Sequence, residues 1–167
     1  MHRLRSASDA VVVGIGTVLA DDPQLTVRDE PAVRQPTRVV VDGSGRTPLS
    51  ARVLDDAADT LVLPEREPEV ALKTLHDKDI RHVWLEGGPR LAASFLRAGL
   101  VDEVIAYVAP ALLGAGPAAV GDLGIPTIDR AARLEFTDVV RVGADVRLRA
   151  RPAADDWATQ PHRTGDQ

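Results

Sequence analysis

Two short runs of valine constrain the fold of this 167-residue chain more than any other feature. Residues 10–14 (AVVVG) and 38–42 (RVVVD) are too short for helices, and their apolar residues are consecutive. This pattern is typical of strands that are buried on both faces, as in parallel sheets covered by helices on both sides. The other predicted elements are strands at 60–64, 82–86 and 103–110 and helices at 1–8, 68–78 and 89–98. The alternation predicts the α/β class.

The C-terminal part of the chain follows a different pattern. Residues 134–141 and 145–151 alternate between polar and apolar side chains around Gly143-Ala144, which predicts an antiparallel hairpin at a sheet edge. We therefore expect a three-layer fold with one mixed, mostly parallel sheet. The expected domain covers residues 1–151, and the polar, aperiodic residues 152–167 are predicted to be a disordered tail.

Composition excludes several classes of function. The chain has no cysteine, which excludes disulfides, thiolate metal sites and a zinc deaminase centre, and its four histidines show no ligand spacing, so we expect no metal. A net charge of −5 and 3% aromatic residues disfavour nucleic-acid binding. No apolar run reaches membrane-spanning length, and the start MHRLRSASD does not resemble a signal peptide. We expect a cytoplasmic protein with no membrane or nucleic-acid partner.

The segment Glu86-Gly87-Gly88-Pro89 lies where a predicted strand passes into a predicted helix. Ligands of α/β sheets bind beyond the carboxyl ends of the strands, and the free amides that open a helix suit a phosphate. The glycines would let a ligand approach the backbone, and Glu86 would face the same crevice. The alternative is a tight turn with a solvated glutamate, and the motif alone does not decide between them.

A second glycine segment, Gly14-Ile-Gly-Thr17, follows the first valine run and continues to Asp21-Asp22-Pro23. It suggests a Rossmann dinucleotide site with Asp42 on the ribose. That interpretation is disfavoured because Leu19 stands at the third glycine position and Pro23 ends the helix after barely two turns.

Arginines at positions 5, 28 and 46 could hold a phosphate. A guanidinium binds phosphate through two parallel hydrogen bonds. For any single arginine, however, a solvated surface charge is the more common explanation.

Three segments in order resemble one known family: HRLRSASDAVVVGIGTVLADDPQLTVR, RVVVDGSGRTP and VWLEGGPRLAASFLRAGLVDEVIAYVAPALLG. They are similar to the C-terminal reductase domain of the bacterial riboflavin biosynthesis protein RibD, over about residues 1–150. The resemblance implies a dihydrofolate-reductase-like fold, a homodimer, and NADPH as cofactor. It also implies a phosphorylated small-molecule substrate, since the family reduces the ribosyl group of 5-amino-6-(5-phosphoribosylamino)uracil to ribityl.

The resemblance also assigns residues to this chemistry. It implies that the substrate is contacted by Arg5, Leu25, Arg28 and Glu86, with Arg28 near its phosphate. It implies that NADPH is contacted by Thr17, Asp21, Gly43 (often serine in the family), Gly88, Pro89, Arg90, Leu91, Ala92, Ala93 and Ser94. Asp21 and Glu86 are the catalytic candidates, with Asp21 expected to transfer a proton that assists opening of the sugar ring.

Two departures from the family pattern leave alternatives open. Arg90 stands where the family commonly has threonine, so arginine either pairs with the cofactor phosphate or points outward. The family's first strand, with its lysine, and a following Ser-x-Trp loop find no match before Met1, so we expect a fold without that strand. The alternatives are therefore a dihydrofolate-reductase-like NADPH enzyme with another substrate, or an inactive domain that only binds a ligand or partner.

Overall fold

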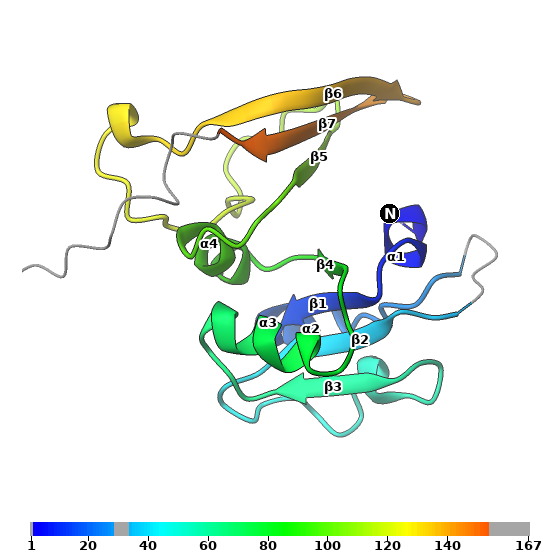
Figure 1. Ribbon diagram of the computed structural model, residues 1–167. Helices are drawn as coiled ribbons and strands as arrows, with labels where there is room; N and C mark the ends of the chain where they lie inside the picture. Colours follow the sequence, from blue (N-terminus) through cyan, green and yellow to red (C-terminus); the bar gives the residue numbers. More distant parts are fainter. Residues whose placement is uncertain (1, 29–33, 154–167) are drawn as a thin grey trace, which may run out of the picture.

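The structure, a computed structural model, describes residues 2–28 and 34–153, and its helices and strands alternate as predicted (Figure 1). The valine runs form β1 (Ala10–Gly14) and β2 (Thr37–Val41). The other strands are β3 (Thr60–Leu63), β4 (Val83–Leu85), β5 (Val104–Val108), β6 (Leu134–Val142) and β7 (Asp145–Pro152). The helices are α1 (His2–Ser6), α2 (Ile15–Asp21), α3 (Pro68–His76) and α4 (Pro89–Arg97), with short 3-10 turns η1 (Arg52–Leu54) and η2 (Ile128–Arg130).

The two valine strands lie at the centre of a parallel sheet whose order is β3-β2-β1-β4. Successive side chains of β1 point to opposite faces, as the pleat requires. Val11 and Val13 join a buried cluster with Val18 of α2, whereas Val12 joins a second cluster with Leu75 of α3. Helices therefore cover both faces of the parallel sheet, which confirms the predicted α/β class and its three layers.

The C-terminal strands form a second sheet, which is antiparallel and has the order β5-β7-β6. The predicted hairpin is confirmed, but the strands are divided between two sheets instead of forming the single mixed sheet that we expected. Among the described residues, β4 and β5 each pair with a strand on one side only, and in Figure 1 the two sheets lie apart with α4 between them. Periodicity indicates which side chains of a strand are buried, and it does not indicate which strands are neighbours.

The hairpin continues further than the predicted domain end at residue 151. Pro152 still pairs with Leu134, and the Ala153 amide donates to the Arg133 carbonyl at 3.1 Å. The first residue of the predicted tail therefore belongs to β7. The remainder of that segment, residues 154–167, lies outside the described residues.

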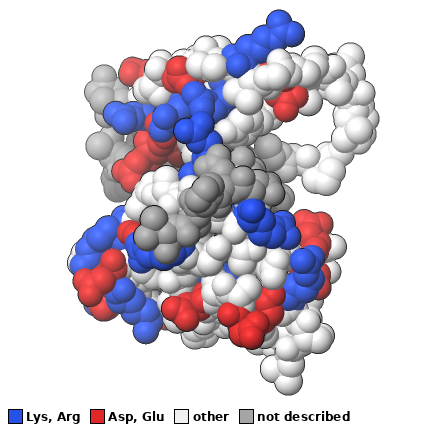
Figure 2. All heavy atoms as spheres, turned by 90° about the vertical axis from the view of Figure 1, so that its right-hand side faces the viewer, with Lys and Arg blue, Asp and Glu red and all other residues white. Residues whose placement is uncertain are grey.

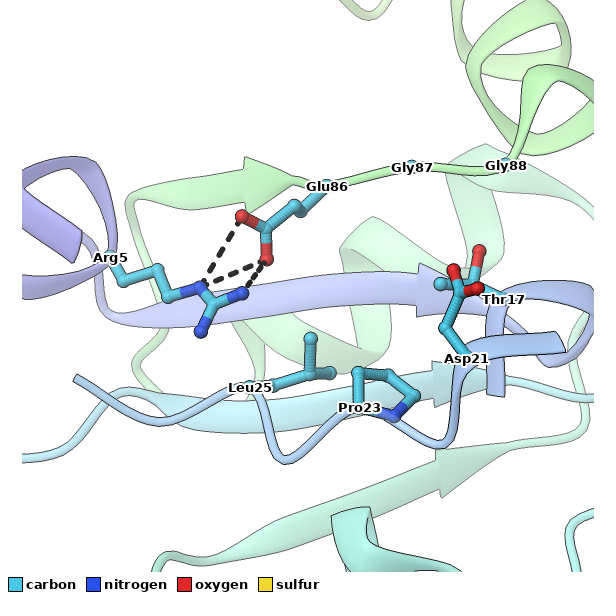
Figure 3. A pocket seen from close by; sticks show the side chains of 8 residues that line it. All are labelled: Arg5, Thr17, Asp21, Pro23, Leu25, Glu86, Gly87 and Gly88. Atoms are coloured by element: carbon cyan, nitrogen blue, oxygen red, sulfur yellow. Dashed lines mark hydrogen bonds and ion pairs between the residues drawn. The ribbon is translucent and has the colours of Figure 1, made fainter. Parts of the chain in front are cut away.

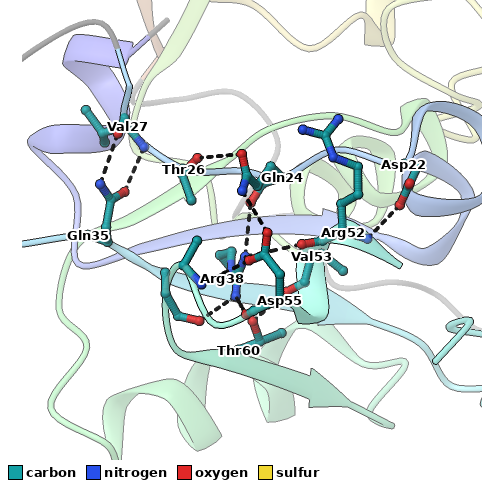
Figure 4. A network of polar contacts seen from close by, with 12 residues as sticks. Asp22, Gln24, Thr26, Val27, Gln35, Arg38, Arg52, Val53, Asp55 and Thr60 are labelled. Atoms are coloured by element: carbon teal, nitrogen blue, oxygen red, sulfur yellow. Dashed lines mark hydrogen bonds and ion pairs between the residues drawn. The ribbon is translucent and has the colours of Figure 1, made fainter. Parts of the chain in front are cut away.

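A buried arginine ties the central sheet to the segment between β2 and β3. The side chain of Arg38 in β2 is 0% exposed, and its Nη1 lies 2.6 Å from Asp55 Oδ1. Its Nη2 donates to the backbone carbonyls of Asp55 and Ala58, and Gln24 Nε2 donates to Asp55 Oδ2 at 2.7 Å (Figure 4). A buried guanidinium is stable only when it is paired and hydrogen-bonded in this way. Through Gln24, the network also fixes the chain that follows α2.

This network predicts how stability depends on pH. Hydrogen bonds from Arg38 and Gln24 lower the pKa of Asp55 from 3.8 to about 2. Because the folded-state pKa is the lower one, the stabilisation is complete above pH 4 and is lost as the pH falls from about 4 to 2. Asp55→Asn should therefore reduce the free energy of unfolding at pH 7 and flatten its decline over that acid range. Urea titrations from pH 2 to 7 measure both effects.

The control is the exposed neighbour Asp56, for which the structure gives no hydrogen bond to its carboxylate. Asp56→Asn should follow the wild-type profile. Acid profiles of equal slope for wild type and Asp55→Asn would contradict the role given to Asp55.

Candidate active site

Because β1, β2 and β4 run parallel, their carboxyl ends meet at one edge of the sheet. At this edge a pocket of about 300 Å³ opens between α2 and the segment that follows β4 (Figure 3). The residues that line it are Arg5, Thr17, Asp21, Pro23, Leu25, Glu86, Gly87 and Gly88. The pocket therefore combines both glycine segments of the sequence with one of the three candidate arginines.

The first wall of the pocket comes from α2. Thr17 and Asp21 are four residues apart, so they lie on the same side of the helix, and both side chains face the pocket. The helix ends at Asp21, and the capping residue Asp22 has a left-handed φ of 40° and donates its amide to the Val18 carbonyl at 3.0 Å. Pro23 then has no amide with which to continue the helix. The helix is two turns long, as predicted, and too short for a Rossmann crossover.

Asp42, the residue of the rejected Rossmann interpretation, has a structural role. It is 2% exposed and accepts hydrogen bonds from the Thr47 amide at 2.7 Å and the Thr47 hydroxyl at 2.8 Å. Burial acts to raise the pKa of Asp42, but the hydrogen bonds from Thr47 and Ser44 outweigh it and lower the pKa below 3.8. Asp42 therefore holds the loop that follows β2, and its carboxylate is not available to a ribose.

The floor of the pocket contains a residue with an unusual backbone. Leu25 has a φ of 58°, which is uncommon for a branched side chain, and it is 2% exposed within the core cluster of β1. Burial of the side chain holds this conformation. The next residue, Thr26, directs its carbonyl to Arg5 Nη1 at 2.9 Å. The left-handed turn therefore places one hydrogen-bond acceptor for the arginine of the pocket.

Arg5 and Glu86 form an ion pair across the pocket. Arg5 Nη2 lies 2.6 Å from Glu86 Oε2, and Arg5 Nε lies 2.9 Å from Oε2 and 3.3 Å from Oε1 (Figure 3). The two side chains are only 12% and 14% exposed. The amide of Glu86 also donates to the Val12 carbonyl at 2.8 Å, which fixes the glutamate to β1. The sequence placed both residues in one site, but it did not indicate that each neutralises the other.

The second wall is the glycine turn between β4 and α4. Gly87 and Gly88 have φ values of 101° and 81°, which L side chains rarely adopt. Pro89 begins α4, so the amides of Arg90 and Leu91 lie in the first turn, where no earlier helical carbonyl can accept from them. The positive end of the helix dipole and these amides favour an anion. The turn therefore has a backbone that only glycine adopts readily, and it leads into a helix start that suits an anion.

Several predicted site residues lie outside the pocket lining. Arg28 is exposed, and its amide donates to His2 Nδ1 at 3.2 Å. Gly43 lies beyond the end of β2, below the guanidinium of Arg66. Residues 89–94 of the predicted cofactor segment also lie outside the lining, and Ala93 is 1% exposed within the fold. The predicted residues that the pocket does unite are Arg5, Thr17, Asp21, Leu25, Glu86 and Gly88.

Two lining residues, Pro23 and Gly87, were not among the predicted site residues. Both belong to motifs that the sequence singles out, Asp21-Asp22-Pro23 and Glu86-Gly87-Gly88. A ligand that approaches the backbone of Gly88 also meets its neighbour, so the second glycine could have been inferred from the motif.

Within the described residues, no group of three or more acidic or histidine side chains could hold a metal ion. None of the described helices is long and apolar enough to cross a membrane. On the face drawn in Figure 2, Lys and Arg alternate with Asp and Glu and form no continuous basic surface. A nucleic-acid backbone requires a basic field, which this face does not offer.

The model of the RibD C-terminal domain family matches residues 1–148. This chain belongs to that family. The riboflavin biosynthesis protein RibD of Mycobacterium tuberculosis H37Rv is 48% identical over 151 residues, which cover 89% of this chain and 44% of that protein. A 2,5-diamino-6-ribosylamino-4(3H)-pyrimidinone 5′-phosphate reductase of Methanothermobacter thermautotrophicus is 39% identical over 174 residues and is covered over 81% of its length. The RibD-type chain thus spans less than half of the mycobacterial relative.

Solved structures agree with this membership of the RibD family. RibD of Acinetobacter baumannii matches with a TM-score of 0.81 at 33% identity, over 91% of this chain and 49% of that one. A deaminase/5-amino-6-(5-phosphoribosylamino)uracil reductase of Thermotoga maritima matches with a TM-score of 0.78 at 26% identity, over 91% of this chain and 47% of that one. A dihydrofolate reductase of Schistosoma mansoni matches with a TM-score of 0.52 at 13% identity, over 87% of this chain and 75% of that one, and shows likeness of fold alone. The predicted dihydrofolate-reductase-like fold is confirmed.

The glycine turn predicts a pair of opposite effects on stability. An alanine Cβ at position 88 would lie 3.4 Å from Thr17 Oγ1, so space is sufficient and the backbone conformation is the obstacle. We expect Gly88→Ala to lower the free energy of unfolding by about 2 kcal/mol. Gly16→Ala is the control: Gly16 is helical with open space around it, so alanine should be neutral or stabilising by up to about 1 kcal/mol. Urea unfolding that ranks the two variants in the reverse order would contradict the requirement for glycine at position 88.

The Arg5–Glu86 pair predicts a second difference in stability. Glu86→Gln keeps the shape of the side chain but leaves the largely buried guanidinium without its charged partner, which should cost about 2 kcal/mol of unfolding free energy. Glu67→Gln replaces an exposed glutamate for which the structure gives no side-chain hydrogen bond, and it should stay within about 0.5 kcal/mol of wild type. Equal unfolding free energies for the two variants in urea titrations would show that the ion pair contributes nothing.

Proposed function

We propose that this chain binds NADPH and reduces the ribosyl group of 5-amino-6-(5-phosphoribosylamino)uracil to a ribityl group. One observation carries the proposal: a single pocket unites the glycine turn at the start of α4 with the Arg5–Glu86 pair. The first feature suits the phosphates of a cofactor, and the second suits a polar sugar. The T. maritima relative is named as a reductase of this uracil compound, and the M. thermautotrophicus relative as a reductase of a related pyrimidinone 5′-phosphate.

The described residues fit a nicotinamide dinucleotide. Gly87 and Gly88 line the pocket and have no side chain of their own to keep a ligand from the backbone, and the first amides of α4 would hold the pyrophosphate. Thr17 lies against these glycines, with its hydroxyl 3.4 Å from where a Cβ of residue 88 would lie, so it would contact the same ligand. Exposed Arg90 can add a charge at the helix start. When bound, NADPH supplies a hydride to the ribosyl carbon.

We assign the substrate phosphate to Arg28. The Arg5 guanidinium is already paired with Glu86, so it adds little net charge to the pocket, whereas the Arg28 side chain is exposed three residues beyond Leu25 on the same segment. Arg5 and Glu86 are then placed to donate to and accept from the sugar hydroxyls. Leu25, in the floor of the pocket, supplies an apolar contact.

The chemistry also requires protons. Opening the sugar delivers one proton to the ring oxygen while the glycosidic nitrogen gives up its own proton, and reduction of the resulting carbon–nitrogen double bond then consumes one hydride and one proton. Both oxygens of Glu86 accept from Arg5, which favours a positioning role for this carboxylate. Asp21 is exposed at the pocket wall, and we assign the proton transfer to it.

We further propose a homodimer in the cytoplasm. Cross-strand partners share one face of the antiparallel sheet, and on that face Val108, Phe136 and Val139 are 51%, 66% and 58% exposed. Leu148 of β7, the cross-strand partner of Val139, continues the same apolar surface. A second copy that covers this face would remove it from water. The cytoplasm suits a biosynthetic step that consumes NADPH.

The direct test is a turnover assay. The purified chain is mixed with NADPH and the aminouracil ribosyl phosphate, and oxidation of NADPH is followed by the loss of its absorbance. The ribityl product is identified by mass spectrometry. The diamino-pyrimidinone phosphate in a parallel reaction distinguishes the two named substrates. Turnover of dihydrofolate alone would indicate another reductase of this fold, and NADPH binding without turnover of any substrate would indicate a domain that only binds ligands. Either result contradicts the proposal.

The proton-transfer assignment predicts the effect of one substitution. Asp21→Asn should lower kcat by about 100-fold or more and leave the Kd for NADPH within a few-fold of wild type, because the amide keeps the shape but cannot transfer the proton. Asp22→Asn is the matched control, because Asp22 lies outside the pocket and its carboxylate accepts, among the described residues, only the Arg52 amide at 2.8 Å. It should keep wild-type kcat. A wild-type kcat for Asp21→Asn would remove Asp21 from the chemistry.

A further inference from the structure

Arg66 lies at the same edge of the sheet as the pocket, beyond the end of β3. Its Nη2 donates to the Gly43 carbonyl at 3.0 Å and to Ser44 Oγ at 3.4 Å, in the loop that follows β2. The carboxyl ends of β2 and β3 are neighbours in the sheet, so the arginine bridges the two loops that follow these strands. The guanidinium therefore has a defined position at a ligand-binding edge, although its side chain is exposed.

Gly43 makes room for this guanidinium. A Cβ at position 43 would lie 2.5 Å from Arg66 Cγ and 2.6 Å from Nε, which is closer than a Cβ atom approaches its neighbours, so the arginine would have to move. Gly43 is not among the glycines with positive φ, so the backbone itself does not require glycine here. The glycine at position 43 is instead explained by the Arg66 side chain that packs against it.

The charge of Arg66 is not compensated within the described part of the chain. No carboxylate there forms an ion pair with it, and the nearby Asp42 is buried and bonded to Thr47. A guanidinium has five donors, and toward the residues that the structure describes Arg66 donates through Nη2 alone. Its remaining donors and the exposed Ser44 hydroxyl can take a phosphate monoester together.

We propose that Arg66, with the Ser44 hydroxyl, binds the 2′-phosphate on the adenosine ribose of NADPH and so selects NADPH over NADH. The inference rests on the proposed function, because it places the second anion of the same cofactor. The order β3-β2-β1-β4 puts β2 two strands from β4, which is roughly 10 Å at the usual strand spacing. The adenosine half of a dinucleotide held at the start of α4 can bridge this distance. Arg66 is a binding residue here and takes no part in hydride transfer.

The test measures binding without turnover. NADPH, NADH, 2′,5′-ADP and 5′-AMP are each titrated calorimetrically into wild type and Arg66→Met, which keeps the length of the side chain and removes its charge. Loss of one charge-assisted contact should raise the Kd of NADPH and of 2′,5′-ADP by about 10-fold and leave the Kd of NADH and of 5′-AMP unchanged. Gly43→Ala, whose Cβ displaces the guanidinium, should lower the preference for NADPH in the same direction.

Arg141→Met is the matched control, because Arg141 is also an exposed arginine that donates to a glycine carbonyl, that of Gly143 at 3.1 Å. It should bind all four nucleotides as wild type does. If Arg66→Met keeps the full NADPH preference, or if Arg46→Met alone abolishes it, the assignment of Arg66 is overturned while the reductase function stands. If wild type binds neither NADPH nor NADH, the proposed function fails first and the assignment fails with it.

Discussion

The parallel pairing of β1 with both β2 and β4 is the constraint on which the rest of the structure depends. It joins segments about 70 residues apart and directs their carboxyl ends to one edge. The two-turn helix α2 and the glycine turn before α4 then become opposite walls of the same pocket. The valines of β1 are fully buried between two core clusters, so neither the register of this strand nor the spacing of the walls can change without exposing the core.

The positively charged groups near this edge differ in whether a carboxylate neutralises them. In the pocket, Arg5 is paired with Glu86, so the sugar-binding region is polar but carries little net charge. Further along, Arg66 has a fixed position and no carboxylate partner among the described residues, and at the helix start backbone amides carry the positive partial charge. Near the amino-terminal end of β2, away from this edge, the buried Arg38 is paired with Asp55 and serves only the fold. The three arginines therefore have different roles, and the difference lies in what each is paired with.

The sequence was sufficient for the parts of the molecule that are set by local patterns. Consecutive valines identified buried strands, and Gly87-Gly88-Pro89 identified the helix start. The motif Asp21-Asp22-Pro23 indicated where α2 ends. Long-range pairing was not accessible in this way: the Arg5–Glu86 contact spans 81 positions, and the division into two sheets depends on which strands become neighbours. The local sequence around Arg38 does not indicate what its guanidinium bonds to, and only the fold shows its buried acceptors.

In the function proposed here, the start of α4 holds the cofactor phosphates beside the pocket formed by Arg5, Glu86 and Asp21. A crystal structure with bound NADP⁺ would show whether it does. We expect the pyrophosphate to accept hydrogen bonds from the amides of Arg90 and Leu91, with the nicotinamide toward Thr17. A nucleotide bound at another edge of the sheet, with these amides directed to solvent, would rule this arrangement out.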